Sequence, residues 1–400
     1  MILAEINPSK PGGLPIMANV KEVAGAFNSG KGFEHPVLDR FKANADSGPS
    51  LYFDMQKVEQ RMDLLAEVAR PFGVTPLLAV KSFPDERCLG SAQRKLGGFD
   101  ISNPVEYACL PNNLSDKLVS IVSPEMDFDI KGFVSKGNAA VVVLDSFTQL
   151  DRYFSQQPGI PYMLRVQSTH LVENTNPAYY QRTRFGFSLE EVGQALKHPK
   201  VIKNPPAGFH VHHGSETNQI TTFQSMIKSL ASLASELQLE PKFINLGGGW
   251  GKLTPEEIGT LLAEARKTFP LPCSILMEPG HWYSKDTGFA VCTVVNQMQS
   301  TDTINYTVNI SKRAHLRWSD VNLIAPIESQ PRKAQRVQFF GPSCFEGDLI
   351  GNFIVPYHSD FSLESGLIPG QQVVFSNVNC YSVAWNASFN GVARAKVNPI

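Results

Sequence analysis

Short apolar runs alternate with amphipathic runs along the chain from about Leu51 to residue 285. The apolar runs have the length of buried strands, and the amphipathic runs repeat apolar residues every three or four positions, which is typical of helices. The strand-like runs are LYFDM, PLLAVK, FDIS, KLVSIVS, AAVVVLD, YMLRVQ, GFHVHH, FINLGGG and SILMEPG, with helical runs such as VEQRMDLLAEVAR between them. About eight such units predict a closed TIM-like β/α barrel.

The pattern changes after Lys285, where strand-like runs follow one another without intervening helices. They are GFAVCTVVNQMQ, TINYTVNI, RVQFFG, NFIVPY, QQVVFSNV and GVARAKV. This arrangement predicts an all-β domain at the C-terminus. Residues 1–48 are rich in Gly, Pro, Asn and Ser and read as an irregular lead-in that joins the β-domain. We therefore expect a lead-in over 1–48, a barrel over 49–285 and a β-domain over 286–400.

The composition narrows the kind of partner. The 400 residues are 42% hydrophobic and 18% charged, so the chain can bury a large core and has no signature of global disorder. Thirty-six Lys and Arg against 37 Asp and Glu give a formal net charge of −1. That balance supplies no field to attract nucleic acid or an anionic membrane, so a small-molecule substrate is the expected partner.

The cysteines and the start of the chain bear on its location. The six cysteines are widely spaced and form no CxxC pair, which favours a reducing cytoplasm over a disulfide framework or a zinc knuckle. The first residues contain no basic segment followed by an apolar run, and no stretch of about 18 apolar residues occurs. Neither secretion nor a membrane span is expected.

Lys81 ends the apolar run PLLAVK. The active site of a β/α barrel lies at the C-terminal ends of its strands, so an unusual residue there is a candidate for chemistry. Desolvation lowers the pKa of an ammonium group and makes it a nucleophilic amine suited to a covalent bond with a carbonyl. A snorkelling surface lysine is the alternative interpretation.

Two further strand ends carry groups suited to a cofactor. In GFHVHHGS, alternation places His210 and His212 on one face, where a flat imidazole suits an aromatic ring, and Ser215 offers a hydroxyl to an anion. The next strand ends in NLGGGWG, and the N–H groups of Gly248 and Gly249 suit a phosphate. A tight turn explains a run of three glycines equally well.

Glu278 ends the next strand, in SILMEPG. A carboxylate in an apolar barrel mouth costs several kcal/mol unless it meets a cation. The pyridinium nitrogen of a cofactor and a structural arginine would serve equally, so this residue alone leaves the two interpretations open.

These motifs together resemble the pyridoxal-phosphate-dependent enzymes of the alanine racemase and ornithine/diaminopimelate decarboxylase superfamily, which is fold type III. The decarboxylase branch is the more similar. LLAVKSF resembles its YAVKAN motif, GFDISNPVEYA its GFDxASxxE, YMLRV and TRFGF its LRI and KFG, and HVHHGS its HxGS. NLGGGWG, EPGHWY, GPSCFEGD and NCYSVAWNASFNG then resemble GGG, EPGR, GPTCDxxD and GAYxxxxxxxFNG. The motifs occur in the same order from about residue 49 to 391.

The resemblance implies a role for each matching residue. Lys81 would hold pyridoxal 5'-phosphate covalently, His212 would stack on its ring, and Glu278 would keep the ring nitrogen protonated. Cys344 would come from a partner subunit as the proton donor, which implies a homodimer with shared active sites. The other implied cofactor contacts are Asp100, Glu106 and Arg165 beside the lysine and ring, and Ser215, Gly248, Gly249, His281 and Tyr381 at the phosphate. No metal is expected.

Two positions depart from the family pattern. His281 stands where the EPGR motif has arginine, so one charged phosphate contact is weakened or replaced. Phe345 follows Cys344, where ornithine and diaminopimelate decarboxylases have an acid for the distal end of the substrate. An apolar residue disfavours those substrates, and the C-x-x-G-D pattern is closer to that of carboxynorspermidine decarboxylases. The candidate substrate contacts are Phe345, Glu346, Asp348 and Trp385.

The expected reaction is removal of the α-carboxyl of an amino acid, or of an amino-acid head group on an aminocarboxypropyl, peptide-like or siderophore-like intermediate. An amino-acid racemase on the same fold is one alternative. An inactive relative that binds partner proteins is a second, favoured only by His281. A metal-dependent barrel hydrolase with ligands at His210 and His212 is a third, although later strand ends offer no further His pair.

Overall fold

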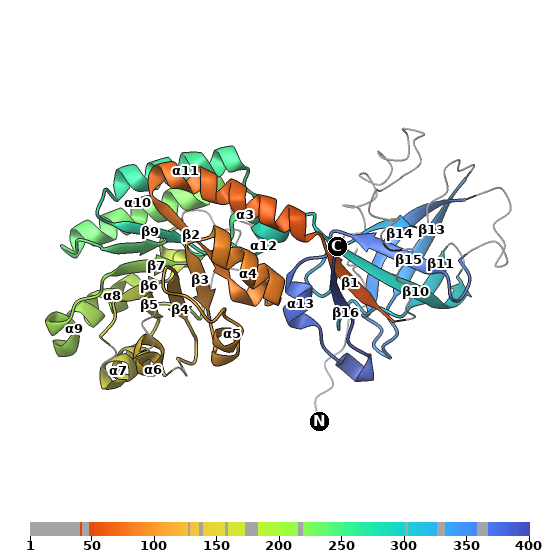
Figure 1. Ribbon diagram of the computed structural model, residues 1–400, viewed down its shortest axis with the longest axis horizontal. Helices are drawn as coiled ribbons and strands as arrows, with labels where there is room; N and C mark the ends of the chain where they lie inside the picture. The colour runs from red at the N-terminus through yellow and green to blue at the C-terminus, as the bar shows by residue number, and fades with distance from the viewer. Residues whose placement is uncertain are drawn as a thin grey trace, which may run out of the picture.

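The computed structural model describes Phe41 and residues 48–126, 129–135, 139–156, 159–172, 183–214, 219–300, 303–325, 333–357 and 367–400. Two units lie side by side in Figure 1: a closed barrel surrounded by helices and a domain built on a β-sheet. Helix α13 (Tyr381–Trp385) of the second unit lies at the junction and contacts the barrel. This architecture confirms the expected barrel with a C-terminal β-domain.

The barrel consists of eight parallel strands, each paired with the next, and the last strand pairs with the first. The strands are β2 (Val74–Ala79), β3 (Gly98–Ile101), β4 (Leu118–Val122), β5 (Ala139–Leu144), β6 (Tyr162–Val166), β7 (Gly208–Val211), β8 (Phe243–Asn245) and β9 (Ser274–Met277). The α-helices are α3 (Met55–Ala69), α4 (Glu86–Lys95), α5 (Pro104–Ala108), α6 (Ile130–Ser135), α7 (Phe147–Gln156), α8 (Leu189–Leu196), α9 (Pro199–Lys203), α10 (Ile220–Glu236), α11 (Pro255–Thr268) and α12 (His281–Ser284). Short 3₁₀ turns are η1 (Arg70–Phe72), η2 (Val80–Ser82), η3 (Ser168–His170) and η4 (Trp250–Lys252).

The continuous apolar runs form barrel strands because both of their faces are buried. Leu77, Met163 and Leu276 pack against one another inside the barrel, whereas Leu78 and Leu164 belong to the larger core beneath the helices. Successive side chains of a strand point to opposite faces, so a strand between a filled interior and a helical layer needs apolar residues at both.

Local side-chain contacts fix where the barrel helices begin. Helix α3 starts after Asp54, whose carboxylate accepts a hydrogen bond from the Lys57 N–H at 3.1 Å. Helix α11 starts with a capping box, in which the Thr254 hydroxyl and the Glu257 carboxylate each accept from the other's backbone N–H. Such caps satisfy N–H groups that have no partner within the helix.

The second unit contains a sheet in the order β12-β15-β10-β11-β13-β14, to which β1 and β16 are added through β10. The strands are β1 (Ser50–Phe53), β10 (Gly288–Gln299), β11 (Ile304–Val308), β12 (Asn322–Ala325), β13 (Lys333–Phe340), β14 (Leu349–Tyr357), β15 (Gln372–Ser376) and β16 (Lys396–Pro399). A 3₁₀ turn, η5 (Phe389–Gly391), follows α13. Stacked and edge-on rings of Tyr306, Phe339, Phe353 and Phe375 fill its centre.

Strand β1 moves the boundary that we expected at residue 49. Ser50 pairs with Val291 of β10 and with Lys396 of β16, so β1 belongs to the second sheet, and the first barrel strand begins at Val74. A short apolar run shows that a strand is buried without showing which sheet buries it, and this is why the sequence pattern misplaced LYFDM. The chain therefore enters the barrel through α3.

Most of the expected lead-in, residues 1–48, lies outside the described residues. Phe41 is described and is 1% exposed, and its ring lies 4.8 Å from the Tyr52 ring and 5.7 Å from the Phe289 ring. Both partners are on strands of the β-domain, so this one lead-in residue packs there.

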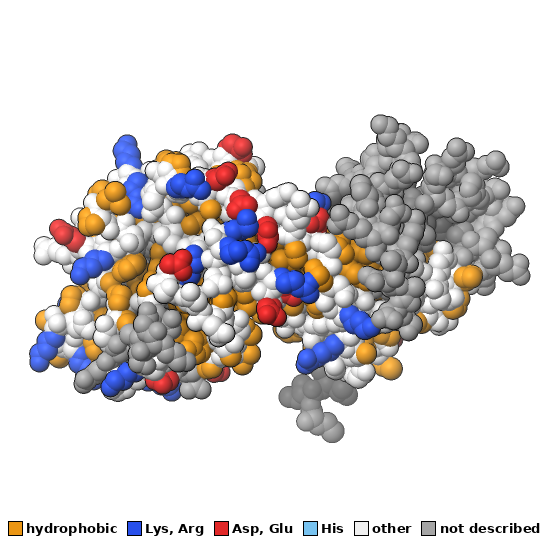
Figure 2. Space-filling view, in the orientation of Figure 1, with side chains coloured by type: hydrophobic (Ala, Val, Ile, Leu, Met, Phe, Trp, Pro, Cys, Tyr) orange, Lys and Arg blue, Asp and Glu red, His pale blue; other side chains and the backbone are white. Residues whose placement is uncertain are grey.

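The surface bears mixed charge. Figure 2 shows cationic and anionic side chains interspersed over the barrel half of the visible face. Within the described ranges, no helix has both the length and the apolar character needed to cross a bilayer.

Candidate active site

The inward-facing positions at the carboxyl ends of the barrel strands are polar. On β3, β4 and β7, the outward-facing neighbours of these positions are apolar and pack under the helices. The register pairs Asp100 with Ser120 and His210 with Asn245, so the polar positions form a layer across the barrel mouth. This layer consists of Asp100, Ser120, Arg165, His210, Asn245 and Glu278.

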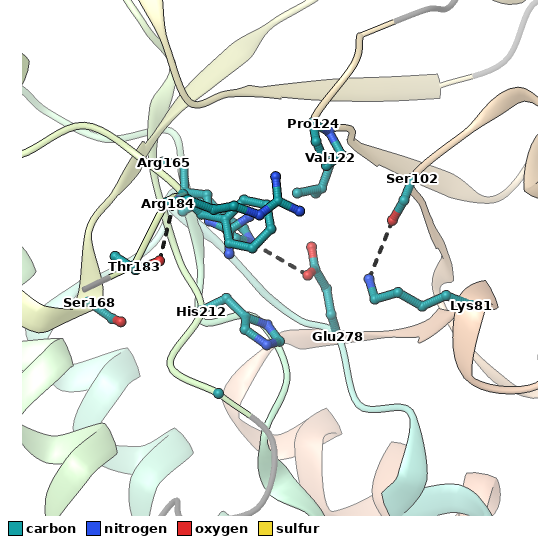
Figure 3. A pocket seen from close by; sticks show the side chains of 13 residues that line it. Lys81, Ser102, Val122, Pro124, Arg165, Ser168, Thr183, Arg184, His212 and Glu278 are labelled. Atoms are coloured by element: carbon teal, nitrogen blue, oxygen red, sulfur yellow. Dashed lines mark hydrogen bonds and ion pairs between the residues drawn. The ribbon is translucent and has the colours of Figure 1, made fainter. Parts of the chain in front are cut away.

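A cavity of about 550 Å³ opens above this layer. Lys81, Arg165, His212 and Glu278 line it, and Figure 3 shows Glu278 between Lys81 on one side and the two arginines Arg165 and Arg184 on the other. Four of the residues that the sequence marked as candidates therefore meet in one cavity.

Lys81 is held by an acid on the neighbouring strand. It lies in η2, directly after β2, and its Nζ is 2.8 Å from Oδ2 of Asp100 on β3 and 3.5 Å from Oγ of Ser102. The Asp100 side chain is completely buried, whereas the Lys81 side chain is 37% exposed and lines the cavity. The amine is thus fixed at one end and accessible from the cavity.

Burial and charge act against each other on this pair. Burial favours the neutral amine of Lys81, but the charges of Asp100 and Glu278 outweigh it, so the pKa of Lys81 lies above its ordinary value. Burial, with the Glu278 charge, raises the pKa of Asp100 to about 7 despite the attraction of Lys81. The expected lowered pKa of Lys81 is therefore wrong for the chain alone, because desolvation is only the first of two opposing effects.

Glu278 is held as a carboxylate by three neighbours. Its Oε1 accepts from Nδ2 of Asn245 at 2.5 Å and from Oγ of Ser120 at 3.1 Å, and its Oε2 lies 3.4 Å from Nε2 of His210. Burial alone would raise the pKa of Glu278, but His210, Lys81 and the Asn245 hydrogen bond lower it to about 2. A fixed negative charge therefore occupies the centre of the mouth.

His212 is oriented by the glycine loop. Its Nδ1 accepts a hydrogen bond from the Gly248 N–H at 3.0 Å, and burial, with the charge of Arg165, lowers the pKa of His212 to about 3. Gly247 has φ +62° and a Cβ there would lie 2.4 Å from the Val211 carbonyl oxygen, so only glycine fits. The ring is thus a neutral imidazole in a fixed pose.

A second corner of the site joins the two domains. A Cβ on Gly280 would lie 2.6 Å from Cβ of Ser82 and 3.3 Å from Oη of Tyr381, which comes from α13 of the β-domain. Burial raises the pKa of Tyr381 to about 12, so its hydroxyl is a neutral donor. His281 begins α12, and its Nδ1 lies 3.5 Å from the Cβ position of Gly251 in the glycine loop.

Glu106 acts on the backbone beside the lysine. Its carboxylate accepts from the Ser102 N–H at 2.8 Å and from Nδ2 of Asn103 at 2.7 Å. It therefore fixes the turn after β3 that carries Ser102 toward Lys81. Ser215 lies outside the described residues.

The Cys344 loop lies in the β-domain, and none of its residues is among those that line the cavity. It connects β13 to β14, and Cys344, Phe345 and Glu346 are exposed. Phe345 lies edge-on to Phe389 at 6.1 Å and beneath the Arg313 guanidinium at 5.0 Å. One chain therefore does not bring these candidates to the lysine.

Asp348 supports this loop. It is 1% exposed, its Oδ1 accepts from Oγ of Ser311 at 2.9 Å, and its Oδ2 accepts from Oγ of Ser343 at 2.6 Å. Both oxygens are engaged, so a direct substrate contact, which the sequence suggested for Asp348, does not fit its position. Trp385 is partly exposed and donates its Nε1–H to the Arg313 carbonyl at 2.8 Å.

Ser120 and Asn245 were missed by the sequence reasoning. Each is a buried polar residue in an apolar strand, in KLVSIVS and FINLGGG, and each holds the Glu278 carboxylate. The signal was present, because a lone polar residue at an inward position of a buried strand needs a partner there. No group of three potential metal-ligating residues is found in the part of the chain that the structure describes.

The site fits a flat cofactor that bears an aldehyde, a basic ring nitrogen and a phosphate. An amine, an imidazole in a fixed pose and a buried anion face one cavity, with a glycine loop and a glycine-lined corner beside it. Among the described residues, the buried atoms Oδ1 of Asp100 and Nδ1 of His210 have no hydrogen-bond partner. Buried polar atoms rarely lack partners, so these two suit a site that binds a polar group.

Comparison with known proteins identifies relatives of similar length. Ornithine decarboxylase of Schizosaccharomyces pombe is 21% identical over 374 residues, which cover 88% of this chain and 83% of that protein. Carboxyaminopropylagmatine decarboxylase of Synechocystis sp. is 24% identical over 374 residues, covering 89% and 90%.

Solved structures share the fold. Lysine/ornithine decarboxylase of Vibrio vulnificus, complexed with putrescine, superposes with a TM-score of 0.75 at 18% identity and covers 91% of this chain and 97% of its own. Carboxynorspermidine decarboxylase of Campylobacter jejuni, complexed with norspermidine, gives a TM-score of 0.70 at 19% identity, with coverage of 88% and 94%.

The family described as "Pyridoxal-dependent decarboxylase, pyridoxal binding domain" matches residues 55–285, which is more than half of the chain. The match covers the strands and glycine loop that carry Lys81, His212 and Glu278. The chain therefore belongs to the pyridoxal-dependent decarboxylase family.

Proposed function

We propose that this protein removes the α-carboxyl group of an amino acid, or of an amino-acid head group carried on a larger molecule. The observation that carries the proposal is the pairing of Lys81 with Asp100 beside Glu278, a carboxylate held anionic at the centre of the mouth. Pyridoxal phosphate, when bound, supplies the electron sink for the pair of electrons left when CO2 departs.

Lys81 is the proposed attachment point of the cofactor. Its Nζ would carry the aldehyde carbon of the cofactor, and Asp100, 2.8 Å away, holds this amine in place at the edge of the cavity and balances its charge. Arg165 adds a nearby positive charge on the cavity wall, and Glu106 holds the Ser102 turn in position.

Glu278 is proposed to hold a proton on the ring nitrogen of the cofactor. Its pKa of about 2 keeps it anionic at neutral pH, so it stabilises a protonated nitrogen by charge and by a hydrogen bond. His212, kept neutral and oriented by Gly248, offers a flat face to the ring.

The phosphate is proposed to lie between the glycine loop and the junction of the domains. Gly249, at φ +94°, turns the loop toward this corner, and Tyr381 offers a neutral hydroxyl. Gly248 is part of the proposal because it has no side chain to obstruct the phosphate, although its N–H donates to His212. His281 lies against the same loop and Ser215 follows His212 along the chain, so both are part of this proposal.

We propose that the site is completed in a homodimer. Cys344, the proposed proton donor, is exposed on the β-domain and does not line the cavity of its own chain. A second copy that covers the mouth would bring its Cys344 loop to the cofactor. All six cysteines are free, which fits a reducing compartment, and we place the protein in the cytoplasm on that ground.

The proposed substrate is larger than a simple diamino acid. Relatives are named for ornithine and for carboxyaminopropylagmatine, and the latter name describes an amino-acid head on a longer molecule. Phe345 cannot pair with a terminal ammonium, whereas Glu346 and Trp385 are exposed in the same region and are retained as substrate contacts.

The test is CO2 release from carboxyl-labelled amino acids and their conjugates by the protein loaded with pyridoxal phosphate. Release of label with formation of the amine is the expected outcome. Loss of optical activity without release of label would replace the decarboxylase with a racemase.

Two exposed cysteines allow a matched control. Cys344→Ala is expected to keep the cofactor and slow formation of the correctly protonated product, whereas Cys109→Ala, at an exposed thiol that ends α5 of the barrel, is expected to leave turnover unchanged. Equal effects of the two substitutions would remove Cys344 from the reaction.

A further inference from the structure

Asn245, the last residue of β8, makes one contact with each end of the proposed cofactor site. Its Nδ2 donates to Oε1 of Glu278 at 2.5 Å, and its Oδ1 accepts from the Gly247 N–H at 2.9 Å. The side chain is fully buried. One amide therefore joins the anion proposed for the ring nitrogen to the glycine loop proposed for the phosphate.

The acceptor contact shapes the start of the glycine loop. A side-chain oxygen that accepts from the N–H two residues later closes an Asx turn, which begins a tight reversal of the chain. Gly247 then adopts φ +62°, and its carbonyl accepts from Nε1 of Trp250 at 2.7 Å and from the Glu278 N–H at 2.8 Å. The peptide groups on both sides of Gly247 are therefore fixed.

The donor contact supports the charge of Glu278. The hydrogen bond from Asn245 is one of the causes that lower the pKa of Glu278 to about 2. Ser120 donates to the same oxygen at 3.1 Å, but it comes from β4 and not from the strand that continues into the glycine loop. Of these two donors to Oε1, Asn245 is the one that also holds the loop.

The chemistry of the two partners requires an amide at this position. A carboxylate accepts and a backbone N–H donates, so the Asn245 side chain gives both a partner only with Nδ2 toward Glu278 and Oδ1 toward Gly247. An ionised carboxylate in its place would accept only, and an apolar side chain would do neither. The two contacts are therefore joined in one planar group.

We propose that Asn245 is a positioning residue that couples the two ends of the cofactor site, by fixing the Glu278 carboxylate and the glycine loop relative to each other. The inference rests on the proposed function, because it concerns how the same site binds pyridoxal phosphate. The ring nitrogen and the phosphate of that cofactor lie on one rigid ring system, so both ends bind fully only where the protein holds their partners at a matching separation.

The experiment measures the two ends separately by comparing pyridoxal phosphate with pyridoxal, which lacks the phosphate. Dissociation constants come from the change in absorbance when each compound is added to the cofactor-free protein. The constant for pyridoxal reports the ring end. The ratio of the pyridoxal constant to the pyridoxal phosphate constant, which we call the phosphate ratio, reports the other end. Urea unfolding of each cofactor-free variant shows whether it is folded.

Substitutions of Asn245 separate its two contacts. Asn245→Ala removes both, so it is expected to weaken pyridoxal binding by about tenfold and to lower the phosphate ratio by about tenfold. Asn245→Leu, which is of similar size, is expected to do the same and replaces the alanine variant if truncation prevents folding. Asn245→Asp keeps an acceptor for the Gly247 N–H, so its phosphate ratio is expected to stay within about twofold of the wild-type value.

Two further variants distinguish this role from a general loss of stability. Ser120→Ala removes the other donor to Oε1 of Glu278, and it is expected to weaken pyridoxal binding by about threefold without changing the phosphate ratio. Asn309→Ala is the matched control in the β-domain, where the Asn309 side chain likewise accepts from a backbone N–H, that of Thr293 at 2.9 Å. It is expected to change neither quantity.

The outcomes separate this inference from the proposed function. A phosphate ratio that stays at the wild-type value in Asn245→Ala and Asn245→Leu, or that falls as far in Asn245→Asp, would overturn the inference and leave the decarboxylase proposal standing. A wild-type phosphate ratio near one would also overturn it, since no phosphate contact would then exist to be coupled. If neither compound binds to the wild-type protein, the cofactor site is absent and both proposals fail together.

Discussion

The barrel mouth and the Cys344 loop differ in how their reactive side chains are engaged. In the mouth, Lys81 is paired with Asp100, and Glu278 is held by three neighbours from three other strands. In the loop, the buried Asp348 fixes the backbone, but Cys344 and Phe345 are exposed and are not among the described residues that line the cavity. The fold of one chain positions the reactive groups of the mouth, whereas in the loop it fixes the backbone alone.

This difference separates two tasks. The groups that would hold and polarise the cofactor come from one chain, since rigid strands position them to within a hydrogen-bond length. The groups that would meet the substrate's far end and return a proton lie on a different surface. The account therefore predicts that cofactor binding and proton return depend on different subunits.

The largest expected effect tests this separation directly. Lys81→Ala removes the attachment point of the cofactor and is expected to lower turnover by about 10³-fold or more. Cys344→Ala removes the proton donor and is expected to lower turnover by about 10²-fold. Random mixing of the two inactive proteins is expected to restore activity to about a quarter of the wild-type value, because half of the dimers are mixed and hold one intact site of two.

The control for mixing uses a residue pair on the same side of the site. Lys81→Ala mixed with Glu278→Gln, which both lie in the barrel mouth, is expected to restore nothing, since every site then lacks one of the two. Recovery in this second mixture, or its absence in the first, contradicts a site shared between subunits.

Glu278→Gln sharpens the description of the mouth itself. Loss of the negative charge is expected to lower turnover by about 10²-fold while pyridoxal phosphate stays bound through Lys81. Glu264→Gln removes the same charge from α11, away from the cavity, and is expected to change turnover by less than about twofold. Turnover and retained cofactor absorbance are measured together, and loss of cofactor from Glu278→Gln would assign that residue to binding alone.

The glycine loop gives a stability test. Gly247→Ala forces a Cβ into a position with φ +62° and 2.4 Å from the Val211 carbonyl oxygen, so the free energy of unfolding is expected to fall by about 1–3 kcal/mol. Gly193→Ala in α8 meets no atom within 4 Å and is expected to raise it by about 0.5–1 kcal/mol. Urea denaturation measures both, and equal effects would show that the loop is not constrained as described.

The smallest expected effect is the pH dependence of the cofactor-free protein. Burial lowers the pKa of His210, and it lowers that of His212 to about 3, against about 6.5 in an unfolded chain. Below about pH 6.5 the unfolded state therefore binds protons that the folded state does not. As the pH falls, each histidine lowers the free energy of unfolding by up to about 1.4 kcal/mol per pH unit.

Glu278 adds to this loss only at lower pH. Its folded pKa of about 2 contributes stability that is complete above about pH 4.5 and is lost as the pH falls toward 2. Asp100 acts in the opposite sense, because its folded pKa of about 7 lies above its unfolded value and the folded state takes up this proton first, which offsets the loss from one histidine. Unfolding midpoints should therefore decline between about pH 6 and about pH 5, where two histidines outweigh one carboxyl, and His212→Phe should leave them nearly level there. A midpoint of the unchanged protein that rises between about pH 6 and about pH 5 is incompatible with two neutral, buried imidazoles.

The sequence predicted the fold correctly where burial alone decides the pattern of hydrophobic residues. The apolar runs from PLLAVK to SILMEPG are buried on both faces, and this is what a barrel strand under helices requires. LYFDM has the same character but pairs with β10 and β16, and no local signal distinguishes the two sheets. Pairing between distant segments is decided by the whole fold, so the boundary at residue 49 could not be read from the run itself.

The sequence predicted the site correctly at the strand ends. The prediction failed where two physical effects oppose each other. Lys81, His212 and Glu278 were identified because each interrupts an apolar run, and all three line the cavity. The direction of the Lys81 pKa was wrong because desolvation is outweighed by several groups together, among them Asp100, 19 positions along the chain, and Glu278. Asp348 was suggested for the substrate because its motif position gives no information on burial.

The most direct test of the account is chemical trapping of the cofactor on its lysine. Purified protein is loaded with pyridoxal phosphate, its absorbance is recorded, borohydride is added, and the reduced protein is digested and mapped. The account predicts an absorbance band that borohydride removes, with one labelled peptide that carries the cofactor on Lys81. A label on another lysine, or no band and no label, would contradict the assignment of the barrel mouth as the cofactor site.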